Sequence, residues 1–300
     1  MRGDVTVVDE KLASPGLPAG LDLLRPVHPF DLGQTLDSGQ VFHWERARVS
    51  GIDGFAGCIG ESPPRFVAQD EDGALLVPAP DAEEVFRYLG LDHDMPAIQA
   101  TFPGDDAFLA EAIAFCPGIR LIRQPLWECL ATFITSSLKQ VAHIRAISLE
   151  IRRRWGVPRE ACGMTAYSYP APEVLAEAGE EALRTCALGY RAKSLHRAAA
   201  AIAGGEIDLQ QVASCDDVDV ARAELMRLHG VGEKIANCVL LFGCGRWETF
   251  PIDVWIERVL RRGYRKRLRG ARLQGWAEDY FGPHAGYAQQ YLFHFARKTF

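Results

Sequence analysis

The amino-acid sequence predicts an α+β protein, with a small N-terminal antiparallel β-sheet domain followed by a larger all-helical domain. Two observations predict this order. Between residues 21 and 80, short apolar or alternating runs such as VFHW, FAGCI, RFVA and ALLV stand between Gly, Pro and Asp turn signals. Beyond residue 80, apolar residues recur at the helical period of about 3.6. We therefore expect a flexible lead-in over 1–20, a strand-rich domain with short helices over 21–117, and a helical domain over 118–300.

The individual elements follow from the same patterns. Strands are expected over 41–44, 55–59, 65–68 and 74–77, with a short helix over 31–36 packed on their sheet. Helices are expected over 83–91, 107–115, 126–137, 141–155, 180–188, 193–203, 217–228, 235–242, 254–262 and 287–298.

Composition places the chain among globular proteins. It has 300 residues, of which 48% are hydrophobic and 24% charged. The sequence contains no apolar run near the roughly 20 residues of a membrane span. The N-terminal segment also lacks the apolar core of a secretory signal. We expect a soluble intracellular protein, located in the cytoplasm or nucleoid of a prokaryote or in the nucleus of a eukaryote.

The charge is unevenly distributed along the chain. Residues 1–120 hold 8 Lys and Arg against 20 Asp and Glu, whereas residues 121–300 hold 25 against 19. The net charge of −6 therefore combines an acidic first part with a basic second part, which favours a polyanionic partner for the second part. The strongest basic run lies between residues 258 and 269. Such a run also fits a plain solvated helix face.

The stretch 228–255, LHGVGEKIANCVLLFGCGRWETFPIDVW, carries the chemistry. Its LHGVG turn stands between two predicted helices, and Gly230 and Gly232 can adopt positive φ or let the backbone approach a ligand. A tight turn at a helix N-terminus presents N–H groups to an anion. Lys234 follows in the first helical turn, where the helix dipole favours a neutral, nucleophilic amine. Asp253 follows Pro251 and can cap the next helix.

This stretch resembles the helix–hairpin–helix signature of DNA base-excision glycosylases, the HhH-GPD superfamily, with LxGVGxKxA followed by an aspartate after Pro-x. The resemblance places the helix–hairpin–helix at about 217–245. It implies that Lys234 attacks C1′ of the damaged nucleotide and that Asp253 assists and stabilises positive charge on the sugar. Either residue alone also fits a surface lysine or a simple helix cap, but both in one segment favour catalysis.

Three further segments resemble 8-oxoguanine DNA glycosylases of the eukaryotic type. They are DSGQVFHW (37–44), RLIRQPLWECL (120–130) and GYAQQYLF (286–293). The resemblance implies that the Gly39 carbonyl accepts the N7–H that oxidised guanine has and guanine lacks. It also implies that Gln289 reads the Watson–Crick edge while Phe293 and Cys238 sandwich the base. Gln289 and Phe293 are four residues apart, on one helix face.

The same resemblance supplies candidate DNA contacts and two departures from the family. Tyr190 and Arg191 match LGYRA, whose tyrosine wedges beside the flipped base. Where the family has three asparagines, the first reading the unpaired cytosine, this chain has Leu138, Lys139 and Gln140. His143 stands in place of the usual arginine, and Trp255 in place of a phosphate-binding histidine. The remaining expected contacts are in the hairpin: His229, Gly230, Val231 and Gly232.

The sequence therefore predicts a bifunctional 8-oxoguanine DNA glycosylase and AP lyase with relaxed opposite-base specificity, acting as a monomer on double-stranded DNA and without membrane association. No catalytic metal or other cofactor is expected. Cysteine is absent after Cys244, so the C-terminal four-cysteine iron–sulfur loop of endonuclease-III-type relatives is not expected. Two alternatives remain open: a helix–hairpin–helix glycosylase for an alkylated or ring-fragmented purine, and a non-catalytic DNA-binding module.

Overall fold

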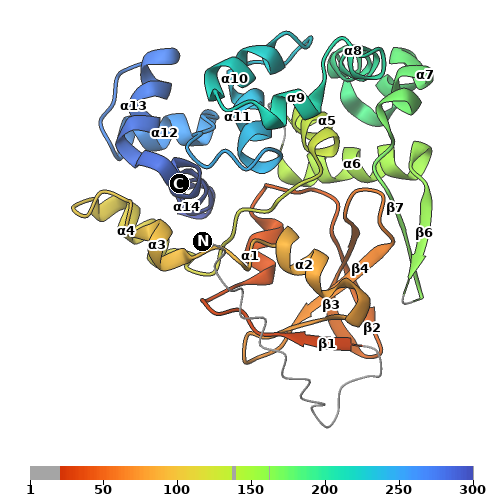
Figure 1. Ribbon diagram of the computed structural model, residues 1–300, viewed down its shortest axis with the longest axis horizontal. Helices are drawn as coiled ribbons and strands as arrows, with labels where there is room; N and C mark the ends of the chain where they lie inside the picture. Colours follow the sequence, from red (N-terminus) through yellow and green to blue (C-terminus); the bar gives the residue numbers. More distant parts are fainter. Residues whose placement is uncertain (1–20, 137–139, 162, 300) are drawn as a thin grey trace.

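The computed structural model describes residues 21–136, 140–161 and 163–299. The expected lead-in over 1–20 lies outside these ranges. Figure 1 shows a small sheet domain on one side and a broad arrangement of helices on the other, with α14 (Ala285–Thr299) near the middle of the molecule. The predicted α+β class, with the sheet first and the helices after it, is confirmed.

Within the described part of the chain, five antiparallel strands form the N-terminal sheet in the order β1-β5-β4-β3-β2. The strands are β1 (Leu21–Leu24), β2 (Glu45–Val49), β3 (Ile52–Cys58), β4 (Pro64–Gln69) and β5 (Leu75–Pro78). Successive side chains of a strand point to opposite faces. Phe55, Val67 and Leu75 accordingly pack with helices α1 (Leu32–Asp37) and α2 (Ala82–Tyr88) on one face. Phe66 and Leu76 belong to a separate cluster on the other.

The predicted strand over residues 41–44 is wrong. These residues have no strand pairing, and strand β2 begins only after them at Glu45. Their side chains are buried at every position, including Phe42 and Trp44. A strand with one solvated face buries alternate residues, so four buried residues in a row fit a segment enclosed on all sides. The segment runs between the sheet and the helices instead of extending the sheet.

The rest of the described chain is mostly helical, and one main core unites these helices. Their bounds are α3 (Met95–Gln99), α4 (Ala107–Phe115), α5 (Leu126–Ser136), α6 (Val141–Trp155), α7 (Pro172–Leu183), α8 (Arg191–Ala203), α9 (Leu209–Ser214), α10 (Val218–Met226), α11 (Glu233–Phe242), α12 (Val254–Arg262) and α13 (Ala271–Phe281), followed by α14. None of the described helices is both long and apolar enough to cross a lipid bilayer.

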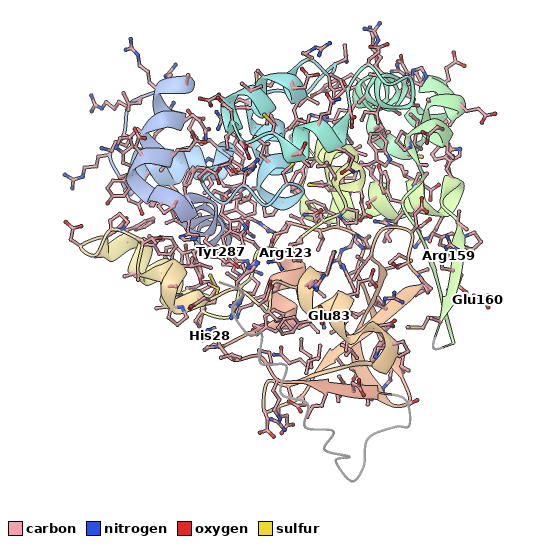
Figure 2. All side chains as sticks on the ribbon, in the orientation of Figure 1. His28, Glu83, Arg123, Arg159, Glu160 and Tyr287 are labelled. Carbon is pink, nitrogen blue, oxygen red and sulfur yellow. The ribbon has the colours of Figure 1, made fainter. Side chains whose placement is uncertain are left out.

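The helical part also contains a hairpin that the sequence patterns do not predict. Its strands are β6 (Pro158–Ala161) and β7 (Met164–Tyr167). The hairpin extends beside the sheet domain, as the labelled residues Arg159 and Glu160 show (Figure 2). Met164 packs on the sheet face formed by Phe66 and Leu76. The hairpin therefore covers a sheet face that would otherwise meet water. The domain boundary at 117/118 stays a prediction.

Residues 118–124 join the two parts through the buried side chain of Gln40. Its amide nitrogen donates to the Arg120 carbonyl at 2.7 Å, and its amide oxygen accepts from Ile122 N at 2.9 Å. Gln124 donates from its side chain to the Gln40 carbonyl at 2.9 Å, and from its backbone to the Phe242 carbonyl at 2.8 Å. Because these groups are buried, their hydrogen bonds are needed to offset lost hydration. Gly39, next to Gln40, is thereby fixed against the helices.

A buried charged cluster reinforces the same junction. Arg152 of α6 forms an ion pair with Glu128 of α5 and donates to the Tyr167 carbonyl of β7 at 3.0 Å. Nδ1 of His43 lies 3.3 Å from Glu128, and its Nε2 bonds the Cys58 carbonyl at 2.8 Å. Burial, aided by the charge of Arg152, holds the pKa of His43 well below its ordinary value. Burial also raises the pKa of Glu128, against the opposing effect of Arg152.

Replacing Glu128 by alanine is expected to lower the free energy of unfolding by about 3–5 kcal/mol, because Arg152 is left buried without a counter-charge. Chemical denaturation measures this loss. Glu83→Ala removes a partner from the exposed Arg87 ion pair and is the matched control, with little expected change. A double variant Glu128→Leu/Arg152→Met should recover much of the loss. Equal stability of Glu128→Ala and the native protein would contradict this account.

Candidate active site

The predicted hairpin is present between α10 and α11. Gly230 has φ +82°, and a Cβ there would lie 2.3 Å from the Ser194 hydroxyl of α8, so the position requires glycine. Gly232 instead has extended backbone with φ −101° and is the N-cap of α11, with open space around it. The Val231 side chain is buried, whereas His229, Gly230 and Gly232 are exposed. The exposed hairpin backbone therefore faces outward at a helix N-terminus, which suits an anion.

Lys234 lies in the first turn of α11 and points toward α5. Its ammonium nitrogen is 3.5 Å from the Ser136 hydroxyl and 4.8 Å from the centroid of the Phe133 ring. The sequence motifs did not identify either neighbour as part of the site. Both come from the helix that follows residues 118–124, so the junction with the sheet domain also positions the surroundings of the amine.

Asp253 is the N-cap of α12, as predicted. Its Oδ1 accepts hydrogen bonds from Trp255 N at 3.0 Å and Ile256 N at 2.9 Å. Burial raises the pKa of the Asp253 carboxyl, while these two N–H groups, Lys234 and Arg297 act in the opposite direction. The carboxylate is thus held in a fixed orientation and its pKa is influenced by Lys234.

Cys238 follows Lys234 by one helical turn and is buried. Burial raises the pKa of its thiol, and the neighbouring Lys234 opposes this rise. A buried, protonated thiol behaves as a small apolar group. Three of the predicted site residues therefore influence one another's pKa: Lys234 in the first turn of α11, Cys238 one turn later, and Asp253 at the start of α12.

Gly39 and Phe293 meet although they lie at opposite ends of the chain. Gly39 has φ +93°, and a Cβ there would come within 3.1 Å of Phe293 Cε1. Gln289, one turn before Phe293 on α14, is 5% exposed, and its side-chain oxygen has no hydrogen-bond partner among the described residues. A buried polar atom without a partner requires an explanation, such as a ligand that supplies one.

Of the nine predicted DNA contacts that the structure describes, six are exposed, Trp255 is partly exposed, and Val231 and Arg191 are buried. The Tyr190 side chain is 67% exposed, and the buried Arg191 stacks 4.4 Å from its ring centroid and donates to its hydroxyl at 2.6 Å. Gln140 and His143 are exposed at the start of α6. Trp255 is partly exposed, with the Arg258 guanidinium 5.0 Å from its ring. Leu138 and Lys139 lie outside the described residues.

The basic run after Asp253 forms a charged surface. Its arginines at 258, 261, 262, 265, 267 and 269 are all exposed, and Lys266 lies over the Trp276 ring at 4.2 Å. Figure 2 shows nitrogen-tipped side chains projecting outward at this end of the molecule. Among the described residues, no group of three or more His, Cys, Asp or Glu side chains is placed to hold a metal ion.

Comparison with known proteins places this geometry in a family. Residues 22–130 match the N-terminal domain of 8-oxoguanine DNA glycosylase, and residues 131–267 match the HhH-GPD superfamily of base excision DNA repair proteins. A probable N-glycosylase/DNA lyase of Methanothermobacter thermautotrophicus is 30% identical, over 91% of this chain and 96% of its own. N-glycosylase/DNA lyase OGG1 of Arabidopsis thaliana is 25% identical, over 96% of this chain and 83% of its own.

A solved structure extends the likeness to three dimensions. The Clostridium acetobutylicum 8-oxoguanine glycosylase/lyase, in complex with double-stranded DNA containing cytosine opposite 8-oxoguanine, superposes with a TM-score of 0.85. It is 27% identical, and the match covers 94% of this chain and 96% of that chain. With both domains matched and a relative at 30% identity along almost its whole length, the chain belongs to the 8-oxoguanine DNA glycosylase family of the HhH-GPD superfamily.

Proposed function

We propose that this protein removes 8-oxoguanine from duplex DNA and then cleaves the strand at the resulting site. The observation that carries the proposal is the contact between Gly39 and Phe293, because it forms a base-recognition element within the same fold as Lys234 and Asp253. A DNA-binding hairpin module without catalytic activity would require neither the Gly39–Phe293 contact nor the combination of Lys234 and Asp253. The family relationship supports the same activity.

In the proposed reaction, the Lys234 amine attacks C1′ of the flipped nucleotide. The bond between C1′ and N9 breaks, and its electron pair leaves with the base. Asp253 stabilises the positive charge that develops on the sugar, which requires the carboxyl to be ionised. The sugar ring then opens to a Schiff base on Lys234. Loss of a C2′ proton expels the 3′ phosphate by β-elimination, and water releases the enzyme.

Base recognition in this proposal rests on four residues. The Gly39 carbonyl accepts the N7–H of 8-oxoguanine and is repelled by the bare N7 of guanine, since both are acceptors. The unpartnered oxygen of Gln289 supports a role for its amide at the Watson–Crick edge. Phe293 and Cys238 enclose the base from two sides. Tyr190 fills the gap in the duplex, and the hairpin binds the phosphates.

The cofactor and specificity proposals rest on the sequence. Residues 245–300 contain no cysteine, which supports an enzyme that holds no iron–sulfur cluster in this segment. Leu138 supports relaxed opposite-base choice, because an aliphatic side chain cannot hydrogen-bond the edge of cytosine.

Lys234→Ala is expected to retain DNA binding and to yield no covalent complex when the reaction is treated with borohydride, because the Schiff base forms on this amine. Denaturing gels with a labelled 8-oxoguanine duplex measure the trapped complex. Lys298→Ala, which changes an exposed lysine at the end of α14, is the matched control and should trap like the native protein. Undiminished trapping by Lys234→Ala would refute the assignment.

Asp253→Asn is expected to slow base release about 10²- to 10⁴-fold under single-turnover conditions. Asparagine caps helices as well as aspartate does, so Tm should change little. Because burial raises the pKa of Asp253, the native rate should begin to fall at a higher pH than an ordinary aspartate would give. The fall accompanies protonation as the pH drops, and the Asn variant should lack it. An unchanged rate in Asp253→Asn would exclude the proposed role.

Excision of 8-oxoguanine paired with C, T, G or A is expected to proceed at rates within about tenfold of each other. Leu138→Asn should raise the preference for cytosine by about 5- to 150-fold, since one specific base contact contributes about 1–3 kcal/mol. Single-turnover incision of the four duplexes measures both. Strict preference for cytosine in the native protein would contradict the interpretation of Leu138.

A further inference from the structure

The guanidinium of Arg297 lies where the Gly39 segment meets α14. Its Nη1 donates to the Ser38 carbonyl at 3.1 Å, and its central carbon is 5.3 Å from the Phe293 ring centroid. A Cβ added to Gly39 would lie 3.1 Å from the same Nη1. One side chain therefore touches the peptide group beside Gly39 and one face of the Phe293 ring.

The carbonyl groups of the residues before and after Gly39 each accept a hydrogen bond from a side chain that lies later in the chain. Arg297 binds the Ser38 carbonyl, and Gln124 binds the Gln40 carbonyl at 2.9 Å. The buried Gln40 amide adds a bond to the Ser38 hydroxyl at 2.9 Å. The direction of the Gly39 carbonyl between these two anchored groups is consequently set in part by Arg297.

The chemistry of this position suits arginine. A guanidinium can donate a hydrogen bond in its plane while its flat face stacks on an aromatic ring, which an ammonium does not do. Arg297 occupies one face of Phe293, so the opposite face is the one on which a base can stack. Burial lowers the pKa of Arg297, and the charges of Asp253 and Asp37 oppose this. An arginine remains charged at neutral pH.

We propose that Arg297 is a positioning residue for base recognition, one that holds the Ser38–Gly39 peptide and the Phe293 ring at a fixed separation. The inference rests on the proposed function, since it assigns the space beside Gly39 and Phe293 to an oxidised purine. Removing Arg297 lets the carbonyl and the ring move independently, and the flipped base loses its orientation relative to Lys234. Misplacement of a reacting group by about 1 Å costs roughly 10²-fold in rate.

Two substrates separate this role from a general structural one. Excision from an 8-oxoguanine duplex requires a correctly seated base. Strand cleavage of a duplex that already contains an abasic site requires Lys234 and Asp253 but has no base to seat. A residue that acts on the base alone must therefore affect the first reaction and spare the second.

The test uses Arg297→Leu in the full-length chain. This substitution keeps an aliphatic side chain against Phe293 and removes the guanidinium group. Single-turnover rates are measured on the plateau of the native pH profile. We expect excision of 8-oxoguanine to fall about 10²-fold, with abasic cleavage and abasic-DNA affinity within about threefold of native. Arg297→Lys retains a positive charge and one donor and should restore excision to within about tenfold of native. Lys298→Leu, a neighbouring exposed cation, is the matched control and should alter neither reaction.

Each other outcome counts against the proposal. If excision and abasic cleavage fall together in Arg297→Leu, the residue supports the fold or Asp253 and not the base. If excision is unchanged while the native protein is active, the positioning role is wrong and the proposed function stands. If the native protein cleaves abasic DNA but does not excise 8-oxoguanine, the proposed function and this inference both fail.

Discussion

The buried amide of Gln40 is the interaction on which the arrangement of the site depends. It bonds to the backbone of Arg120 and Ile122, while the backbone carbonyl of Gln40 accepts from Gln124, whose own N–H donates to the last residue of α11. A buried amide of this kind is costly if any partner is lost. The sheet domain is therefore held in one register against the helices, and Gly39 is carried to a fixed place beside α14. The charged cluster around Glu128 and Arg152 holds the same junction from the other side.

The proposed reactive pair, Lys234 and Asp253, depends on a different constraint, the starts of two helices. Lys234 lies in the first turn of α11, and Asp253 is the N-cap of α12. At the start of a helix, backbone N–H groups have no partner within the helix and can bind an anion or a capping carboxylate. The Asp253 carboxylate is oriented by this capping, and its burial brings it under the influence of Lys234 and Arg297. Capping thus serves the stability of α12 and the placement of a functional group at the same time.

Much of this could be predicted from the sequence because the signals are local. The bounds of α4, α6 and α12 follow from apolar periodicity and from caps such as Asp253, and the hairpin follows from its glycines. The strand prediction for residues 41–44 was wrong because a short apolar run indicates burial but does not distinguish a strand from an irregular buried segment. The contact of Arg297 with Ser38 was missed because tertiary packing alone brings these positions together. The available sequence signal was the position of Arg297 four residues after Phe293, which places both side chains on one helix face.

The proposed base-recognition element joins residues 38–40 to the last helix of the described chain, so two distant parts of the sequence must both be in place before it exists. The hairpin and its lysine, in contrast, are formed by one continuous segment, residues 218–242. Under the proposed function, local opening at the junction would therefore abolish recognition of the base while the hairpin stayed folded. In that state the proposed enzyme would hold DNA without acting on its bases.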